Sequence, residues 1–282
     1  METRFYMTYA RDSPLDIIDY AEKHQVPLMT SAMNRYSTAY GRFMEMDPYE
    51  TPRVVDSGGF TAMEQHGDYP WTVKEYHNWL QQNTDKFEWA AVMDLACEER
   101  FDDLLTKKER MEKTIENTVE HFSYDRDYEL IPVLQGRTVD DWVWSYEQLV
   151  KHGVPVENVG LGTVCRVSSS FRLVEIERKL RKRCPKIDKI HGFGVKMTAF
   201  SCGVSFESAD SYAWSYPANF GRLWGMDRGG RLQQREASHL STTTRRWACF
   251  RNYYDVVSRL HERATAPDEV GITFTYKWGT NW

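Results

Sequence analysis

Three segments of the chain end a run of apolar residues on polar groups that could do chemistry: residues 54–60, 131–136 and 208–212. In the first, a β-branched run stops at Asp-Ser-Gly-Gly-Phe, which places a carboxylate, a hydroxyl and two backbone amides without side chains where a strand leaves the core. A plain turn is the structural alternative for this segment, because glycine is common in loops of every kind. In a parallel barrel, however, such strand ends form the face where substrates bind.

The elements that would position these groups follow from the spacing of the apolar residues. Eight runs have the length of a strand: residues 4–9, 26–32, 53–56, 89–94, 130–135, 158–162, 189–194 and 206–210. Helical patterns lie between most of them, for example at residues 73–82, 107–122, 139–152 and 169–183, the last with Ser168 or Ser169 as its N-cap. Strands that alternate with helices over eight repeats of roughly 30 residues predict an α/β fold, the (β/α)8 TIM barrel.

The last part of the chain does not continue this alternation. We expect a catalytic barrel over residues 1–215 and a C-terminal helical extension over residues 216–282, with a long helix at about residues 235–264. An aromatic tail then ends at Trp278 and Trp282. Because no low-complexity linker separates the two parts, the extension is expected to pack on the barrel and not to form an independent domain.

The composition excludes several classes of protein. With 282 residues, 41% of them hydrophobic, the chain can bury a full core without a partner. No apolar run is long enough for a bilayer and no signal peptide is recognised, so a cytoplasmic protein without membrane contact is expected. The five cysteines are scattered singly and never spaced as Cys-x-x-Cys, which predicts reduced thiols and no structural zinc or other cofactor.

The charge is distributed unevenly along the chain. The net charge is −5, yet residues 166–263 contain 19 Lys and Arg against 9 Asp and Glu. A basic region on an acidic protein indicates a polyanionic partner that contacts one face. A first cluster, at residues 178–183, shares a predicted helix with Glu175 and Glu177 and is more typical of a solvated helix face. The members of the second cluster are Arg222, Arg228, Arg231, Arg235, Arg245, Arg246 and Arg251. Aromatic residues lie between them, so these arginines either contact phosphates beside stacked bases or have a structural role.

Polar residues and glycines stand at the C-terminal ends of six predicted strands, where they should face one pocket: Asp56, Asp94, Gln135, Gly162, His191 with Gly192, and Asp210. Asp94 ends an apolar run, which is costly unless the carboxylate binds a ligand or is satisfied by backbone amides. The Gln135 amide can donate and accept at once, as recognition of a base edge requires. The glycines are either strand-end turns or sites where the backbone approaches a flat ligand.

The order of these motifs resembles that of the tRNA-guanine transglycosylase superfamily and, within it, of the small DpdA-like branch that inserts 7-deazaguanines into DNA. The resemblance covers about residues 4–215 and implies that Asp210 is the nucleophile and Asp56 a general acid/base. The positions it implies for base binding are Ser57, Gly58, Gly59, Phe60, Asp94, Gln135, Gly162, His191 and Gly192. Either Phe60 or Phe193 would then stack on the base.

Two departures from the tRNA enzymes favour DNA as the partner. Those enzymes carry a zinc site after the last strand, where this chain has only His239 and Cys249, and archaeal members add RNA-binding domains. The resemblance thus implies a DNA-guanine transglycosylase that exchanges guanine for a free 7-deazaguanine such as preQ0, through a covalent aspartyl–sugar intermediate; a need for accessory proteins stays open. Phosphate contacts are expected from Arg222, Arg228, Arg231, Arg235, Arg245 and Arg246.

Base exchange requires two carboxyl groups with different roles, and this requirement can be argued without the resemblance. Cleavage of an N-glycosidic bond passes through an oxocarbenium-like state that one carboxylate can capture, while a second moves protons on the base side. A stacked target base must first be flipped out of the duplex. The alternatives are a zinc-free tRNA-guanine transglycosylase, a (β/α)8 glycoside hydrolase with Asp56 and Asp210 as its carboxylate pair, and a non-catalytic nucleic-acid-binding barrel.

Overall fold

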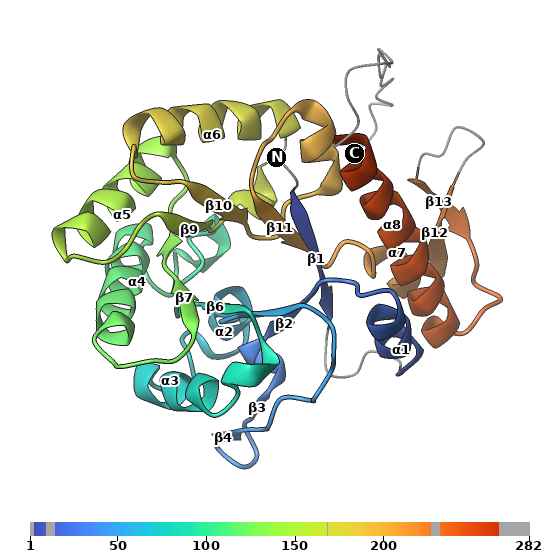
Figure 1. Cartoon of the computed structure of the whole chain (residues 1–282), viewed down its shortest axis with the longest axis horizontal. Helices are drawn as coiled ribbons and strands as arrows, with labels where there is room; N and C mark the ends of the chain where they lie inside the picture. Colours follow the sequence, from blue (N-terminus) through green and yellow to red (C-terminus); the bar gives the residue numbers. More distant parts are fainter. Residues whose placement is uncertain (1–2, 10–14, 168, 227–231, 265–282) are drawn as a thin grey trace.

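The structure, a computed structural model, describes residues 3–9, 15–167, 169–226 and 232–264. Its centre is a ring of parallel strands (Figure 1). The ring consists of β1 (Arg4–Tyr9), β2 (Leu28–Ser31), β5 (Arg53–Asp56), β6 (Trp89–Ala91), β7 (Glu129–Ile131), β8 (Val133–Leu134), β9 (Asn158–Leu161), β10 (Lys189–Gly192) and β11 (Ser208–Ser211). The first strand, β1, pairs with the last, β11, as well as with β2, and the two ends of the sheet, β7 and β8, follow each other in the chain. The sheet is therefore nearly closed, and the predicted (β/α)8 barrel is confirmed.

The strand predicted at residues 130–135 is present in two pieces. Pro132 separates β7, which pairs with β6, from β8, which pairs with β9. Proline has no N–H to donate, so the ladder is interrupted there, although its carbonyl still accepts a 2.8 Å hydrogen bond from the Gly160 amide. The two pieces together form the fifth strand of the barrel.

Helices cover the outside of the ring (Figure 1). They are α1 (Leu15–Lys23), α3 (Val73–Gln81), α4 (Lys107–Phe122), α5 (Val139–Lys151) and α6 (Ser170–Arg183). Three of them begin with a capping box, at Thr72, Thr106 and Thr138, and these local signals explain why the predicted boundaries hold to within one residue. Ser169 occupies the N-cap position of α6 but makes no side-chain capping bond, and Ser168 lies outside the described residues.

An aromatic layer fills the interior of the barrel. Tyr6 of β1, Trp89 of β6 and His191 of β10 have ring centroids 4.9 to 6.1 Å apart. These strands are not neighbours in the sheet, so the three contacts cross the inside of the ring. All three side chains are buried, and they close the barrel beneath the C-terminal ends of the strands.

The segment after the barrel differs from the prediction of a helix that begins at residue 235. After the short helix α7 (Tyr216–Asn219), an antiparallel hairpin forms from β12 (Arg222–Met226) and β13 (Leu232–Glu236), in which Arg235 pairs with Leu223. The helix α8 (Thr242–Ala264) begins only after Ser241, whose hydroxyl oxygen accepts a 3.1 Å hydrogen bond from the Thr244 amide. The aromatic tail with Trp278 and Trp282 lies outside the described residues.

Helix α8 takes the place of the helix that follows the eighth strand of a barrel. It contacts α1, β1 and the hairpin. Cys249, Phe250, Tyr253 and Val257 are buried in the same core cluster as residues of β1, β9 and β10. Within the described part of the chain, none of the helices combines the length and the hydrophobicity that a bilayer span requires.

Candidate active site

A cavity of about 380 Å³ opens at the C-terminal ends of the barrel strands. Eight of the residues singled out in the sequence line it: Asp56, Gly59, Phe60, Asp94, Gln135, Gly162, Phe193 and Asp210. They come from the ends of six strands or from the segments that directly follow them. The barrel therefore brings together side chains that are up to about 150 residues apart in the sequence.

Asp210 is buried on β11 with both carboxylate oxygens bonded. The Thr8 hydroxyl donates to Oδ2 at 2.8 Å, and the Gly194 amide donates to Oδ1 at 2.9 Å. The His191 Nε2 atom lies 3.4 Å from the same Oδ1, and its Nδ1 is 2.8 Å from the Ser208 hydroxyl. These contacts hold the carboxylate in one orientation at the floor of the cavity.

Asp56, at the end of β5, is the carboxyl whose protonation the site perturbs most clearly. Burial raises its pKa well above the usual range, and the nearby charges of Asp94 and Asp210 raise it further. The Gly58 amide, which donates to Oδ2 at 3.1 Å, acts in the opposite direction. The site thus favours a proton on Asp56 beside the fixed carboxylate of Asp210, an arrangement that suits a general acid next to a nucleophile.

Asp94 belongs to a hydrogen-bonded wall of the cavity. Its oxygens accept a 2.8 Å bond from the Ser57 hydroxyl and a short bond from the Gln135 amide. Gln135 in turn accepts from the Thr163 hydroxyl at 2.7 Å. Burial raises the pKa of Asp94, and the bonds from Gln135 and Ser57 lower it in part. Ser57 lies behind Asp94 and does not itself line the cavity.

The glycines serve close packing as well as turn formation. Gly58 has a φ of 86° and caps α2 (Gly59–His66), a conformation that favours glycine. A Cβ on Gly59 would lie 2.0 Å from the carbonyl oxygen of Asp94, and a Cβ on Gly162 would lie 2.3 Å from Nε2 of Gln135. The absent side chains thus let the wall of the cavity form.

His191 and Gly192 do not line the cavity. His191 is part of the buried layer beneath it and reaches the site only through Asp210. A Cβ on Gly192 would collide with the Phe206 ring, so this glycine is required for packing.

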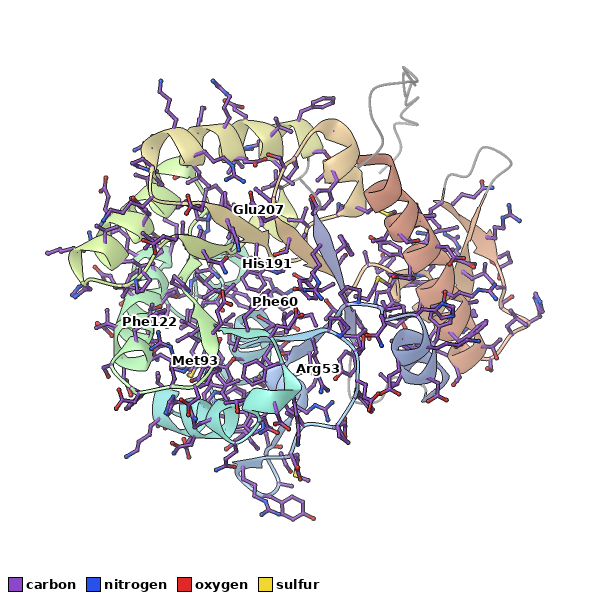
Figure 2. The ribbon with its side chains drawn as sticks, viewed as in Figure 1. Arg53, Phe60, Met93, Phe122, His191 and Glu207 are labelled. Carbon is purple, nitrogen blue, oxygen red and sulfur yellow. The ribbon has the colours of Figure 1, made fainter. Side chains whose placement is uncertain are left out.

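Both aromatic candidates for stacking line the cavity. Phe60 lies on α2, with its ring 5.5 Å from that of Phe101, and Phe193 follows β10, with its ring 4.6 Å from that of His191. Figure 2 shows Phe60 and His191 within the outline of the strand ring. Two aromatic faces are therefore available to a flat ligand.

Several lining residues were not identified from the sequence: Thr8, Glu98, Thr163 and Cys165. Thr8 and Thr163 stand at or just beyond strand ends, which is the signal that could have found them. Thr163 has a φ of 60°, unusual for a β-branched residue, and its hydroxyl accepts a 3.0 Å bond from the Cys97 amide. Glu98 lies on the loop after β6 and Cys165 in the short 3-10 turn η4 (Val164–Arg166), where the sequence has no comparable signal.

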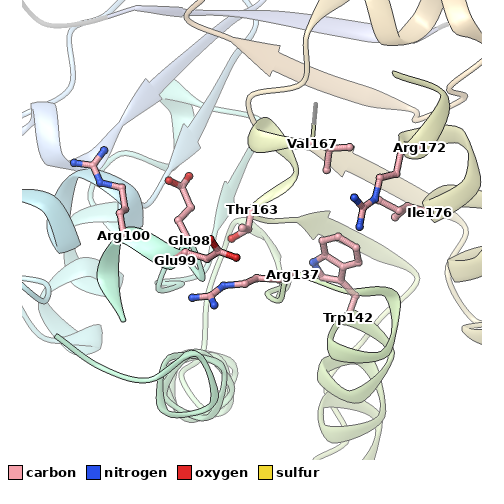
Figure 3. Close-up of a pocket in the computed structure, with 9 residues that line it drawn as sticks. All are labelled: Glu98, Glu99, Arg100, Arg137, Trp142, Thr163, Val167, Arg172 and Ile176. Atoms are coloured by element: carbon pink, nitrogen blue, oxygen red, sulfur yellow. The ribbon is translucent and has the colours of Figure 1, made fainter. Parts of the chain in front are cut away.

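A second cavity of about 610 Å³ adjoins the first (Figure 3). Glu98 and Thr163 line both cavities, and three arginines that were not expected at the site line the second: Arg100, Arg137 and Arg172. Arg100 forms an ion pair with Glu64 at 2.5 Å, and Arg137 is bonded to Asp102.

The arginines expected to contact phosphate occupy different environments. Arg222 and Arg235 are exposed on the hairpin, Arg246 is half-buried, and Arg228 and Arg231 lie outside the described residues. Arg245 is buried and donates to the carbonyls of Ala218 and Leu240 and to the Thr242 hydroxyl. Its guanidinium joins α8 to the segments around it, so we remove Arg245 from the expected phosphate contacts.

Within the described residues, no group of three or more His, Cys, Asp or Glu side chains could hold a metal ion. Cys249 is buried, and its sulfur accepts a 3.4 Å bond from the Trp224 amide.

The comparison with known proteins agrees with this geometry. No curated protein gives a significant match to the chain. The family model DpdA, described as DeoxyPurine in DNA protein A, matches residues 22–234, which include Asp56, Asp210 and most of the barrel. This match, together with the parallel barrel, supports a transglycosylase-type enzyme and establishes that the chain belongs to the DpdA family.

Proposed function

We propose that this protein exchanges a guanine base in DNA for a free 7-deazaguanine, through a covalent bond between Asp210 and C1′ of the sugar. The observation that carries the proposal is the cavity in which Asp210, fixed through both oxygens, faces a second carboxyl whose pKa is raised. The family description, which names deoxypurine in DNA, supports DNA as the polymer.

The reaction proceeds in two displacements at C1′. An Asp210 oxygen forms a bond to C1′ as the bond from C1′ to N9 breaks, and the bonding electrons leave with guanine, which takes a proton from Asp56. The incoming base then attacks C1′ through N9, its proton passes to Asp56, and the bond from C1′ to Asp210 breaks. Both carboxyl groups return to their initial state, and the configuration at C1′ is retained.

The polar wall supplies groups for holding the base. The Asp94 carboxylate can accept from the N1–H and 2-amino groups of guanine, which are both donors, and the Gln135 amide can donate to O6. Phe60 and Phe193 offer their rings to the faces of the base. The N9 end then points to Asp210, across the barrel from Asp94.

The test is mass spectrometry of nucleosides after incubation of the purified protein with preQ0 and either DNA or tRNA. The proposal predicts a preQ0 deoxynucleoside in DNA and release of an equal amount of guanine. Modification of tRNA without DNA would assign the protein to tRNA instead, and guanine release without insertion would identify a hydrolase. Nucleic-acid binding with neither product would leave a non-catalytic barrel.

A further inference from the structure

Three aromatic side chains are exposed in the short segment that follows the proposed nucleophile. Tyr212, Tyr216 and Phe220 are 40%, 57% and 61% exposed, and they make up three of the six large apolar side chains that are strongly exposed in the described residues. Tyr212 comes two residues after Asp210 and lines the active-site cavity with it. Exposed aromatic rings that gather in one place mark a surface for a partner, and the proposed reaction gives these three no role.

The turn that carries these rings is anchored from inside by Trp214. The indole ring is fully buried and packs edge-to-face on Phe250, with ring centroids 5.1 Å apart, and its N–H donates to the carbonyl of Thr8 at 2.7 Å. The amide and the hydroxyl of Ser215 both donate to the Tyr212 carbonyl, at 3.1 and 3.0 Å. The backbone between the exposed rings is therefore fixed before a partner binds, so binding does not have to order this segment.

The proposed reaction determines which part of the DNA passes this segment. The target base enters the cavity toward Asp94, and its sugar stays at Asp210. The sugar–phosphate backbone leads out of the cavity from Asp210, where Tyr212 stands at the exposed rim and α7 follows. Once the target base is flipped out, the base next to it has lost a stacking neighbour, and one of its faces is open to an aromatic side chain.

We propose that Tyr212, Tyr216 and Phe220 form a stacking surface for the unpaired bases of DNA next to the target guanine. The inference rests on the proposed function, which places the sugar at Asp210. The rings of Tyr216 and Phe220 lie with their centroids 4.9 Å apart, so they form one continuous aromatic surface. Every base has a π face, so such a surface holds the strand without selecting its sequence. Arg222, which is exposed at the start of β12 two residues later, adds a positive charge for the phosphates of the same strand.

The test measures binding of an oligothymidine that carries one central guanine, with 2-aminopurine as its 5′ or 3′ neighbour and with no acceptor base present. Flipping of the guanine brightens 2-aminopurine unless another ring covers it, so the wild-type complex should stay dim at one of the two positions. The double variant Tyr216→Leu, Phe220→Leu keeps apolar surface but loses both rings. It should bind about tenfold more weakly or worse, and its complex should be bright at that position. The slope of log affinity against log salt concentration should not change, because no charge is removed.

Two further variants serve as controls. The double variant Tyr216→Trp, Phe220→Trp restores the aromatic faces and should bind within about twofold of the wild type. Tyr40→Ala removes a ring that is 73% exposed on the turn between β3 (Tyr36–Ser37) and β4 (Arg42–Phe43), away from α7 (Figure 1), and should also bind like the wild type. Because all of these side chains are exposed, Tm should stay within about 3 °C of the wild-type value in every variant.

Three results would overturn the stacking surface: wild-type affinity and fluorescence in the double leucine variant, an equal loss of affinity in Tyr40→Ala, or tighter binding of the RNA oligonucleotide of the same sequence, which would make RNA the occupant. The binding assay contains no acceptor base. A wild type that binds as expected but inserts no labelled preQ0 into the same oligonucleotide would therefore refute the proposed function alone.

Discussion

Replacement of Asp210 by asparagine tests the nucleophile with little disturbance to the fold. In the wild type, the carboxylate accepts from Thr8 at 2.8 Å and from the Gly194 amide at 2.9 Å. The asparagine oxygen can keep the bond from Gly194, whose N–H can only donate. Its amide nitrogen then faces the Thr8 hydroxyl, which can turn and accept. Because both bonds have replacements, the free energy of unfolding should change by no more than about 1 kcal/mol.

The rate of base exchange should change much more than the free energy of unfolding. An amide cannot form the ester with C1′, so base exchange should fall by on the order of 10⁴ or more, which corresponds to over 5 kcal/mol of transition-state stabilisation. The assay is incorporation of labelled preQ0 into DNA, combined with denaturing electrophoresis to detect DNA covalently bound to the protein. Wild-type protein should form this adduct when no acceptor base is present, and Asp210→Asn should not.

Thr8→Val is the matched control for this experiment. It removes the hydrogen bond to Oδ2 but leaves the carboxylate, so the adduct should still form, about tenfold more slowly. Exchange by Asp210→Asn at near the wild-type rate, or an adduct with that variant, would refute the assignment of Asp210 as nucleophile.

The remaining predictions concern proton transfer, the basic hairpin and metal content. Because the pKa of Asp56 is raised in the folded protein, its proton is held at low pH and lost as pH rises through that pKa. The rate of guanine release should therefore fall over the same pH range, and in Asp56→Asn this pH dependence should be absent. Asp56→Asn should also raise Tm, most at alkaline pH, where the wild type buries a charge. A pH profile of guanine release with the same shape in Asp56→Asn would contradict this role. Neutralising Arg222 and Arg235 together should weaken binding to DNA of any sequence and reduce the slope of log affinity against log salt concentration by roughly one unit per lost contact. The control Arg245→Gln, which removes donors to the carbonyls of Ala218 and Leu240, should lower Tm instead. An unchanged slope in the double variant would show that the hairpin does not contact phosphate. Elemental analysis of the purified protein should find no stoichiometric zinc, and about one zinc per chain would overturn this and direct attention to Cys202, His239 and Cys249.

The sequence by itself determined the barrel and the positions of its strand-end groups. Strand and helix patterns are local, so the eight strands and the main helices could be predicted from the periodicity of the apolar residues. The capping boxes at Thr72 and Thr106, which the structure shows, are local signals of the same kind. A carboxylate at the end of an apolar run, as at Asp94, is likewise visible in the sequence. Since parallel strands of a closed barrel end on one face, the convergence of Asp56, Asp94 and Gln135 followed from the fold class.

The sequence-based prediction was wrong at positions where tertiary packing, and not the local residue pattern, selects the conformation. Residues 232–236 have no apolar periodicity of their own, and they became a strand because β12 pairs with them. Arg245 reads as a surface cation in the sequence, yet α8 turns it inward to the carbonyls of Ala218 and Leu240.

The tertiary structure alone decided the details that govern the chemistry. The raised pKa of Asp56 depends on burial and on the charges of Asp94 and Asp210, which are distant in sequence. His191 ends a strand like the other candidates, but its side chain points into the buried layer below the cavity and reaches only Asp210. Glu98 joined the site because the loop after β6 meets the loop after β9 at Cys165. Such contacts depend on distances between loops, which periodicity does not encode and only the closed barrel fixes.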